Sequence, residues 1–347
     1  MKRFIHPLRN LASLLALSAT MAFTSCQLDR SLLRNNDQPW QFVRFDHAVE
    51  DYLATGTFAS WQKLTTDFPR ETQTLVEDIL HLGKMDEEQI GDTLRTFYSD
   101  TTLVKLRHDV ERHFANLSPY EKDLTQAFHR LTEECPDFVT PHIYSQNSAF
   151  NQSIVVGDSL LGISLDKYLG ADYPAYKKYF YENQRVTMIP QRIVQDCLTY
   201  YLAQQYILPQ MKQLPDPSLL EMMLHQGKIA WVVAQLTDRP LVDIAAVTPA
   251  TKQWYTTHEK SVWSTLSHPD TLASTDRAVV HSILMTSDAH PYFKDPHSRG
   301  VGLWLGMRII DSYMKHNPKQ TINSLLHDTD YRRILQHSHY PGDAQAE

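Results

Sequence analysis

A histidine-glutamate pair comes nearest to metal chemistry in this chain. His258 and Glu259 begin an H-E-x-x-H pattern, in which two histidines one helical turn apart hold zinc and the glutamate activates water. Val262 stands where the second histidine must be. Trp254, Val262 and Trp263 have the spacing of a helical core stripe. We therefore predict that His258 and Glu259 lie on a polar or partly buried helix face, outside any catalytic zinc site.

The other histidines give no better metal site. The chain has 17 His, yet none lies between residues 143 and 224. His337 and His339 could both contact a metal from an extended segment, but no third ligand is near and a solvated C-terminal segment is the simpler interpretation. The G-x-S-x-G, P-loop and G-x-G-x-x-G patterns are absent. We predict no catalytic residue, cofactor or metal ligand, and hence no enzyme. A metallopeptidase-like enzyme with an unrecognised zinc site, built from His258, Glu259 and other histidines, is the alternative.

Cys26 is the residue best suited to covalent modification. Three basic residues precede an apolar stretch at residues 11–23, and two small residues then lead into Cys26. This order is typical of a bacterial export signal, and a cysteine at the cleavage point indicates lipidation. We predict a lipoprotein signal peptide at 1–25, lipid chains such as palmitate on Cys26, and a polar tether at 26–40. An ordinary secretory signal with a chance cysteine is the alternative.

The composition is that of an acidic globular protein. Of the 347 residues, 42% are hydrophobic and 21% are charged, and the formal net charge is −7. The predicted signal peptide holds three bases and no acid, so its removal leaves 30 bases against 40 acids. This balance argues against nucleic-acid binding, because phosphate contacts need clustered lysine and arginine. No second apolar run suggests a membrane span.

Apolar periodicity predicts one mainly helical domain over residues 41–347. Residues 138–163 differ, since they are rich in β-branched and aromatic residues and are divided by turn formers. We expect a small antiparallel sheet of three or four strands there, and a short strand at 41–45. Prolines punctuate the helical segments that follow. These helices are expected at about 190–208, 217–236, 251–266, 273–285 and 303–316, with shorter ones within 319–337.

The segment 162–173 concentrates carboxylates around a glycine. Asp166 and Asp172 bracket Tyr168 and Gly170, and Asp158 lies shortly before them. We expect Asp166 to cap the helix that follows, Tyr168 to pack in the core, and Gly170 to adopt a positive φ. A calcium, partner or glycan site is the alternative, because calcium takes several oxygen ligands, but the EF-hand spacing is missing.

The same segment resembles a motif of the gliding-motility lipoprotein GldB family of Bacteroidetes, and other motifs agree in the same order. They include the helix with Trp254, Glu259 and Trp263, and the glycine-rich approach at 299–302. Trp304, Gly306 and residues 312–314 follow, and Ser338 and Tyr340-Pro341 match the motif near the family's C-terminus. The resemblance covers nearly all of the chain after the signal, and it depends on the order and spacing of these motifs.

The resemblance implies an outer-membrane lipoprotein of the gliding-motility and type IX secretion-associated class. Its partners would be other gliding or type IX secretion lipoproteins and envelope proteins, with the membrane reached through lipid. The family is also distantly similar to H-E-x-x-H zinc peptidases. Residues 192–202 would match the metal helix and His225 the third-ligand region, so a degenerate zincin-like fold is implied. We expect contacts at a cleft between the sheet, the 162–173 segment and the 217–236 helix.

A third hypothesis is that the protein is a surface lipoprotein that binds glycan or peptide. Trp231, Trp304 and Tyr313 could stack on a sugar, although their spacing fits core stripes equally well.

Overall fold

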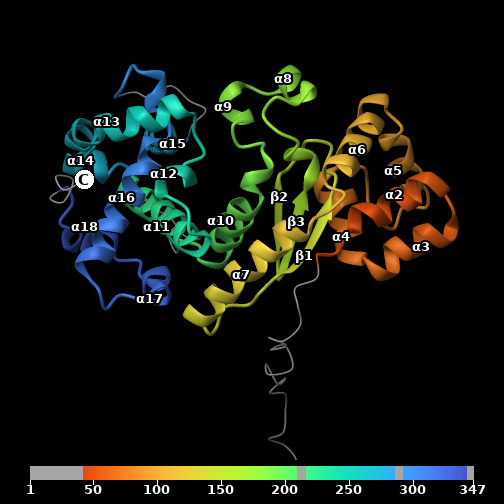
Figure 1. Cartoon of the computed structure of the whole chain (residues 1–347), viewed down its shortest axis with the longest axis horizontal. Helices are drawn as coiled ribbons and strands as arrows, with labels where there is room; N and C mark the ends of the chain where they lie inside the picture. Colours follow the sequence, from red (N-terminus) through yellow and green to blue (C-terminus); the bar gives the residue numbers. More distant parts are fainter. Residues whose placement is uncertain (1–41, 209–215, 286–291, 342–347) are drawn as a thin grey trace, which may run out of the picture. The chain divides into compact units, whose positions relative to one another are not determined.

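The computed structural model describes residues 42–208, 216–285 and 292–341. These residues form mainly helices with one small sheet, as the sequence predicts (Figure 1). The predicted signal peptide, Cys26 and tether lie outside the described residues. Within the described ranges, no helix is both long and apolar enough to cross a bilayer.

Helices fill the first part of the described chain. Asp100 illustrates how the sequence fixes their ends, because its carboxylate accepts the first backbone N–H groups of the helix that begins at Thr101. Phe45, Leu64 and Leu94 are fully buried in the core that these helices enclose. The elements are α2 (Phe45–Thr55), α3 (Phe58–Asp67), α4 (Pro69–Gln73), a π-helical turn (Thr74–Ile79), α5 (Ile90–Tyr98), α6 (Thr101–His113) and α7 (Ser118–Glu134).

The sheet has three strands in the order β1-β3-β2: β1 (His142–Gln146), β2 (Ile154–Gly157) and β3 (Leu160–Ser164). Strand β2 pairs antiparallel with β3, but β1 pairs parallel with it. The prediction of an antiparallel sheet is therefore wrong in part. The two-residue turn at 158–159 joins β2 and β3 as a hairpin. The loop after β1 leads to β2 at the far edge of the sheet, so β3 returns between the two and runs parallel to β1. Residues 138–140 form no strand, and of the described residues 42–45 only Val43 forms a bridge, to Tyr144.

Short helices connect the sheet to the long C-terminal ones. Most predicted helices are present, with ends shifted by a few residues. The elements are η3 (Leu165–Lys167), α8 (Pro174–Tyr179), α9 (Glu182–Arg185), η4 (Pro190–Arg192), α10 (Ile193–Gln205), α11 (Leu219–Thr237), α12 (Leu241–Ile244), α13 (Pro249–Leu266), α14 (Pro269–Leu272), α15 (Arg277–Leu284), η6 (Pro296–Ser298), α16 (Val301–His316), α17 (Ile322–His327) and α18 (Tyr331–His337).

Helix α11 is the buried centre of the C-terminal half, and α16 is its most extensive neighbour. Ser218 and Glu221 form a capping box at its start, which satisfies its first backbone N–H groups. Gly227 of α11 faces Gly306 of α16, so closely that a Cβ on Gly227 would lie 2.7 Å from the Gly306 Cα. The two backbones can approach this far only because both positions lack a side chain.

Helix α10 separates the sheet from α11. It packs against β2 and β3 on one side and against α11 on the other (Figure 1). The expected cleft between the sheet, the 162–173 segment and α11 is therefore wrong, because α10 fills that space. Cys197 of α10 is a buried free thiol, and Cys135 is also free.

Candidate functional site

Asp166 is fully buried and organises the loop that follows β1. Its two carboxylate oxygens accept the backbone N–H groups of Ser148, at 2.7 Å, and of Phe150, at 2.6 Å. Burial raises the pKa of Asp166, and these two N–H groups partly offset that rise. The expectation that Asp166 caps a helix after it is wrong, because its partners precede it in the chain. Asp166 instead ties β3 to the β1 loop.

The neighbours of Asp166 have separate surroundings. Tyr168 is buried and donates its hydroxyl to Asp196 on α10, at 3.0 Å. Gly170 has φ +106°, the positive value that its residue type predicts. Asp172 is exposed and pairs with Lys177 at 2.9 Å. Since one aspartate is enclosed and the other faces solvent, the segment does not bring its two carboxylates into a shared calcium site.

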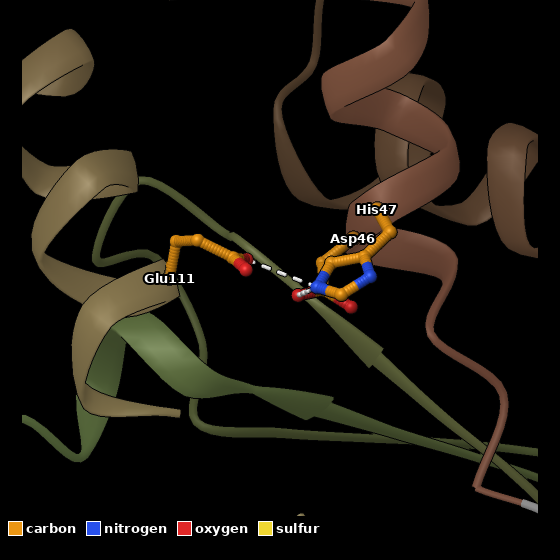
Figure 2. Close-up of side chains that lie close together, drawn as sticks. All are labelled: Asp46, His47 and Glu111. Atoms are coloured by element: carbon orange, nitrogen blue, oxygen red, sulfur yellow. Dashed lines mark ion pairs between the residues drawn. The ribbon is translucent and has the colours of Figure 1, made fainter. Parts of the chain in front are cut away.

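One group of three potential metal ligands occurs among the described residues: Asp46, His47 and Glu111 (Figure 2). Their ligand atoms lie within 4.8 Å of one another. The Arg44 guanidinium already holds Asp46 through two hydrogen bonds of 2.9 and 2.7 Å, and it lies 3.6 Å from Glu111. A metal would have to compete with this cation, so the group serves as an ion-pair network between α2 and α6. The residue pattern did not predict this network, because α2 and α6 are far apart in the chain.

His258 and Glu259 point to different environments. His258 is exposed and stacks on Trp254, with ring centroids 4.6 Å apart. Glu259 is buried, and Val262 and Trp263 are buried in the core as predicted. The pair is therefore divided between solvent and the interior, so a zinc ion could not use both residues from this helix position.

Glu259 is bound by donors from two other segments. The Trp304 indole N–H donates to its carboxylate at 3.0 Å, Arg308 Nε at 3.2 Å and the Tyr340 hydroxyl at 2.9 Å. Burial of Arg308 lowers its pKa, but the nearby charges, Glu259 first, and the hydrogen bond to Glu259 outweigh this effect and raise the pKa of Arg308 overall. The motifs around residues 254–263, 299–314 and 338–341 thus converge on one carboxylate.

A surface cavity of about 760 Å³ opens beside this carboxylate. We call it the Glu259 pocket. It lies between α12, α13, α16 and the segment that contains Tyr340. Its lining consists of Pro240, Leu241, Val242, Thr256, Thr257, Glu259, Lys260, Trp304, Arg308, Asp311, Ser312, Lys315 and Tyr340. The sequence analysis singled out Glu259, but it missed Lys260, Arg308, Asp311 and Lys315, which carry no recognisable motif.

His225, in the predicted third-ligand region, is buried in a structural contact. Its Nδ1 lies 2.8 Å from the Tyr331 hydroxyl. Lys228, one turn further on, donates to the carbonyls of Leu326 and Asp328, both at 3.0 Å, and so ties the end of α17 to α11. Burial lowers the pKa of Lys228 to about 8 and, with Lys228 as a second cause, lowers the pKa of His225 to about 4. Both groups therefore have a structural role in holding α11 to α17 and α18.

The His225 environment predicts a loss of stability in mild acid. The unfolded chain takes up a proton near the usual histidine pKa of about 6.5, whereas the folded chain resists protonation down to about pH 4. The free energy of unfolding should therefore fall as the pH drops between these values, by up to about 3 kcal/mol. Urea unfolding at several pH values measures this slope. His225→Gln should flatten it and the exposed His258→Gln should not; equal slopes in both variants would contradict the assignment.

Comparison with known proteins now gives the family. The family described as gliding motility protein GldB matches residues 29–342, which is nearly the whole chain. No curated protein and no solved structure matches. The distant similarity to zinc peptidases is not among these matches and stays a prediction. The extent of the family match is sufficient to conclude that this chain belongs to the GldB gliding motility protein family.

Proposed function

We propose that this chain is an outer-membrane lipoprotein that binds protein partners and catalyses no reaction. Lipid on Cys26 would hold it to the membrane. Its partners would be other gliding or type IX secretion lipoproteins and envelope proteins. Membership of the GldB family supports the link to gliding motility. The basic, apolar and cysteine-containing order of residues 1–26 supports the lipid anchor.

The hydrogen bonds that Glu259 accepts are the observation that best supports a pocket which binds a partner and catalyses no reaction. A general base needs an oxygen that can reach a substrate proton. The Glu259 carboxylate is buried and is already bound by Trp304, Arg308 and Tyr340. Its role is therefore to position these three side chains in the wall of the Glu259 pocket. A fixed wall of this kind favours recognition of a ligand over proton transfer.

The two alternative functions have less support. A metallopeptidase built on His258 and Glu259 would need both side chains at one metal, but His258 is exposed and stacked on Trp254. A glycan-binding surface would need exposed rings, yet Trp231, Trp304 and Tyr313 are 8%, 5% and 2% exposed. Binding of a protein partner is the function that is compatible with the environments observed for these residues.

Reversing one charge at the rim of the Glu259 pocket should remove partner binding. We expect Lys260→Glu to abolish a cross-linked complex formed in envelope membranes and to impair the gliding or secretion that depends on it. Lys260 is exposed, so the fold should tolerate the change. The measurement is quantitative cross-linking of the tethered chain, followed by identification of the partner. Lys319→Glu, an exposed lysine outside the pocket, is the matched control and should retain the complex.

Two further readouts bear on the rest of the proposal. Cys26→Ala serves as the untethered control, and we expect it to leave the membrane fraction. Elemental analysis of the metal-repleted wild-type chain should find far less than one zinc per chain. A stoichiometric zinc that disappears in His258→Ala, together with peptide hydrolysis, would replace the binding proposal with the enzyme alternative. If the two lysine variants cross-linked equally well, the Glu259 pocket would not be the partner-binding surface.

A further inference from the structure

The carboxylates that line the Glu259 pocket are already occupied by donors. Glu259 accepts from Trp304, Arg308 and Tyr340. Asp311 accepts the indole N–H of Trp231 at 3.1 Å on one oxygen, and its other oxygen pairs with Lys315 at 3.1 Å. Both acids therefore have much of their acceptor capacity already used within the protein.

The hydroxyl groups of the pocket also donate their hydrogen bonds to acceptors within the protein. Thr257 donates to the Gln253 carbonyl at 2.8 Å, and Ser312 donates to the Ser338 carbonyl at 2.6 Å. Tyr340 donates to Glu259 at 2.9 Å. These oxygens can therefore offer only lone pairs to a ligand.

Cationic nitrogens supply the donors that remain. No described residue pairs with Lys260, although it lines the pocket. Arg308 uses Nε for Glu259, and its Nη2 has no hydrogen-bond partner among the described residues. Lys315 forms an ion pair with Asp311 at 3.1 Å. Three cations against two carboxylates leave the lining with one spare positive charge. That excess suits a monoanion better than a phosphate, which carries up to two negative charges.

One wall of the pocket is apolar. It consists of Pro240, Leu241 and Val242, which lead into and begin α12. The volume of about 760 Å³ falls in the range of pockets that enclose a small ligand or a few residues of a peptide. A ligand that fits both surfaces has a carboxylate for the cations and an apolar group next to it for this wall.

We propose that the Glu259 pocket binds a peptide carboxylate that has an apolar side chain beside it. This inference rests on the proposed function, because it names the chemistry of the partner segment. The carboxylate can be the free C-terminus of the partner or an aspartate or glutamate side chain within it. Both sources present the same monoanionic acceptor to Lys260 and to the outer edge of Arg308, and charge-assisted hydrogen bonds of this kind are the strong ones in proteins.

Calorimetric titration of the purified full chain in nonionic detergent tests the proposal with three N-acetylated peptides. The first is Ser-Gly-Leu-Val with a free C-terminal carboxylate, the second is its C-terminal amide, and the third is the amide with aspartate in place of glycine, which puts the acid beside leucine. We expect saturable binding of the first or third peptide and at least tenfold weaker binding of the second. Lys260→Gln should weaken binding of the acidic peptide roughly fivefold to tenfold, and Lys319→Gln should not.

The outcomes separate this inference from the proposed function. Preference for the first peptide identifies a C-terminal carboxylate, and preference for the third identifies an acidic side chain. Equal binding of all three peptides, no saturable binding of either acid, or equal effects of the two lysine variants would overturn the inference. If the cross-linked complex still depends on Lys260 in that case, the pocket binds a partner through other chemistry. Loss of that dependence as well would mean that the Glu259 pocket has no part in the proposed partner binding.

Discussion

Gly306→Ala is expected to destabilise the protein by about 2 kcal/mol. In an exposed helix, alanine would be better than glycine by up to about 1 kcal/mol. At Gly306, however, a Cβ would overlap the Met223 carbonyl oxygen and lie 3.3 Å from the Gly227 Cα. These are backbone atoms of α11 and cannot rotate away, so the two helices must separate along a well-packed contact. Overpacking of this kind commonly costs about 1–3 kcal/mol, and here it exceeds the gain in helix propensity.

Urea unfolding followed by circular dichroism measures this effect. Gly157→Ala is the matched control, because a Cβ there would meet only the Leu160 side chain, at an ordinary 3.5 Å. That variant should remain within about 1 kcal/mol of the wild type. A Gly306→Ala protein that is more stable than the wild type would mean that α11 and α16 do not cross at this glycine pair.

Asp166→Ala should have the second large effect, a loss of about 3 kcal/mol of unfolding free energy. The change removes the acceptors of two backbone N–H groups, those of Ser148 and Phe150, and each unsatisfied buried donor costs about 1–3 kcal/mol. Ala149 and Phe150 have φ of +51° and +69°, values that are uncommon for residues with side chains. The Asp166 carboxylate is what holds the backbone in that conformation.

Thermal and urea unfolding of three variants test this role. Asp166→Asn should lose less than Asp166→Ala, because its amide oxygen can still accept one of the two N–H groups. Asp172→Ala should change little, since Asp172 is exposed and solvent screens its surface ion pair with Lys177. If Asp166→Ala left stability unchanged and abolished binding of a partner, calcium or a glycan, the residue would be a ligand-binding group.

The sequence predicted the helical class because its signals are local. The proline, the N-cap and the apolar stripe that define α13 all lie within residues 248–266. The direction of β1 could not be predicted in this way, because alternation along a strand is the same for parallel and antiparallel neighbours. For this reason the sequence predicted an antiparallel sheet, whereas the observed sheet contains one parallel and one antiparallel pair.

The sequence could likewise identify single residues of the candidate site, but not the distant residues that they contact. The sequence identified Asp166 and Glu259 as notable, and it assigned Asp166 a cap because a carboxylate before a helix usually is one. Its actual partners belong to a loop between two strands, which only the pairing of β1 with β3 brings near. Arg308 and Lys260 gave no signal, because isolated surface cations are common and their significance depends on the cavity that they share.

The closure of the Glu259 pocket by Tyr340 has a practical consequence for studies in cells. The Tyr340 hydroxyl binds Glu259, and the Ser338 carbonyl binds Ser312, so one side of the pocket depends on the last turn of the described chain. A fluorescent protein or affinity tag fused shortly after residue 341 would sit at the mouth of the pocket and could block a partner by bulk alone. Insertion at the exposed turn of residues 158–159 would report localisation without that interference.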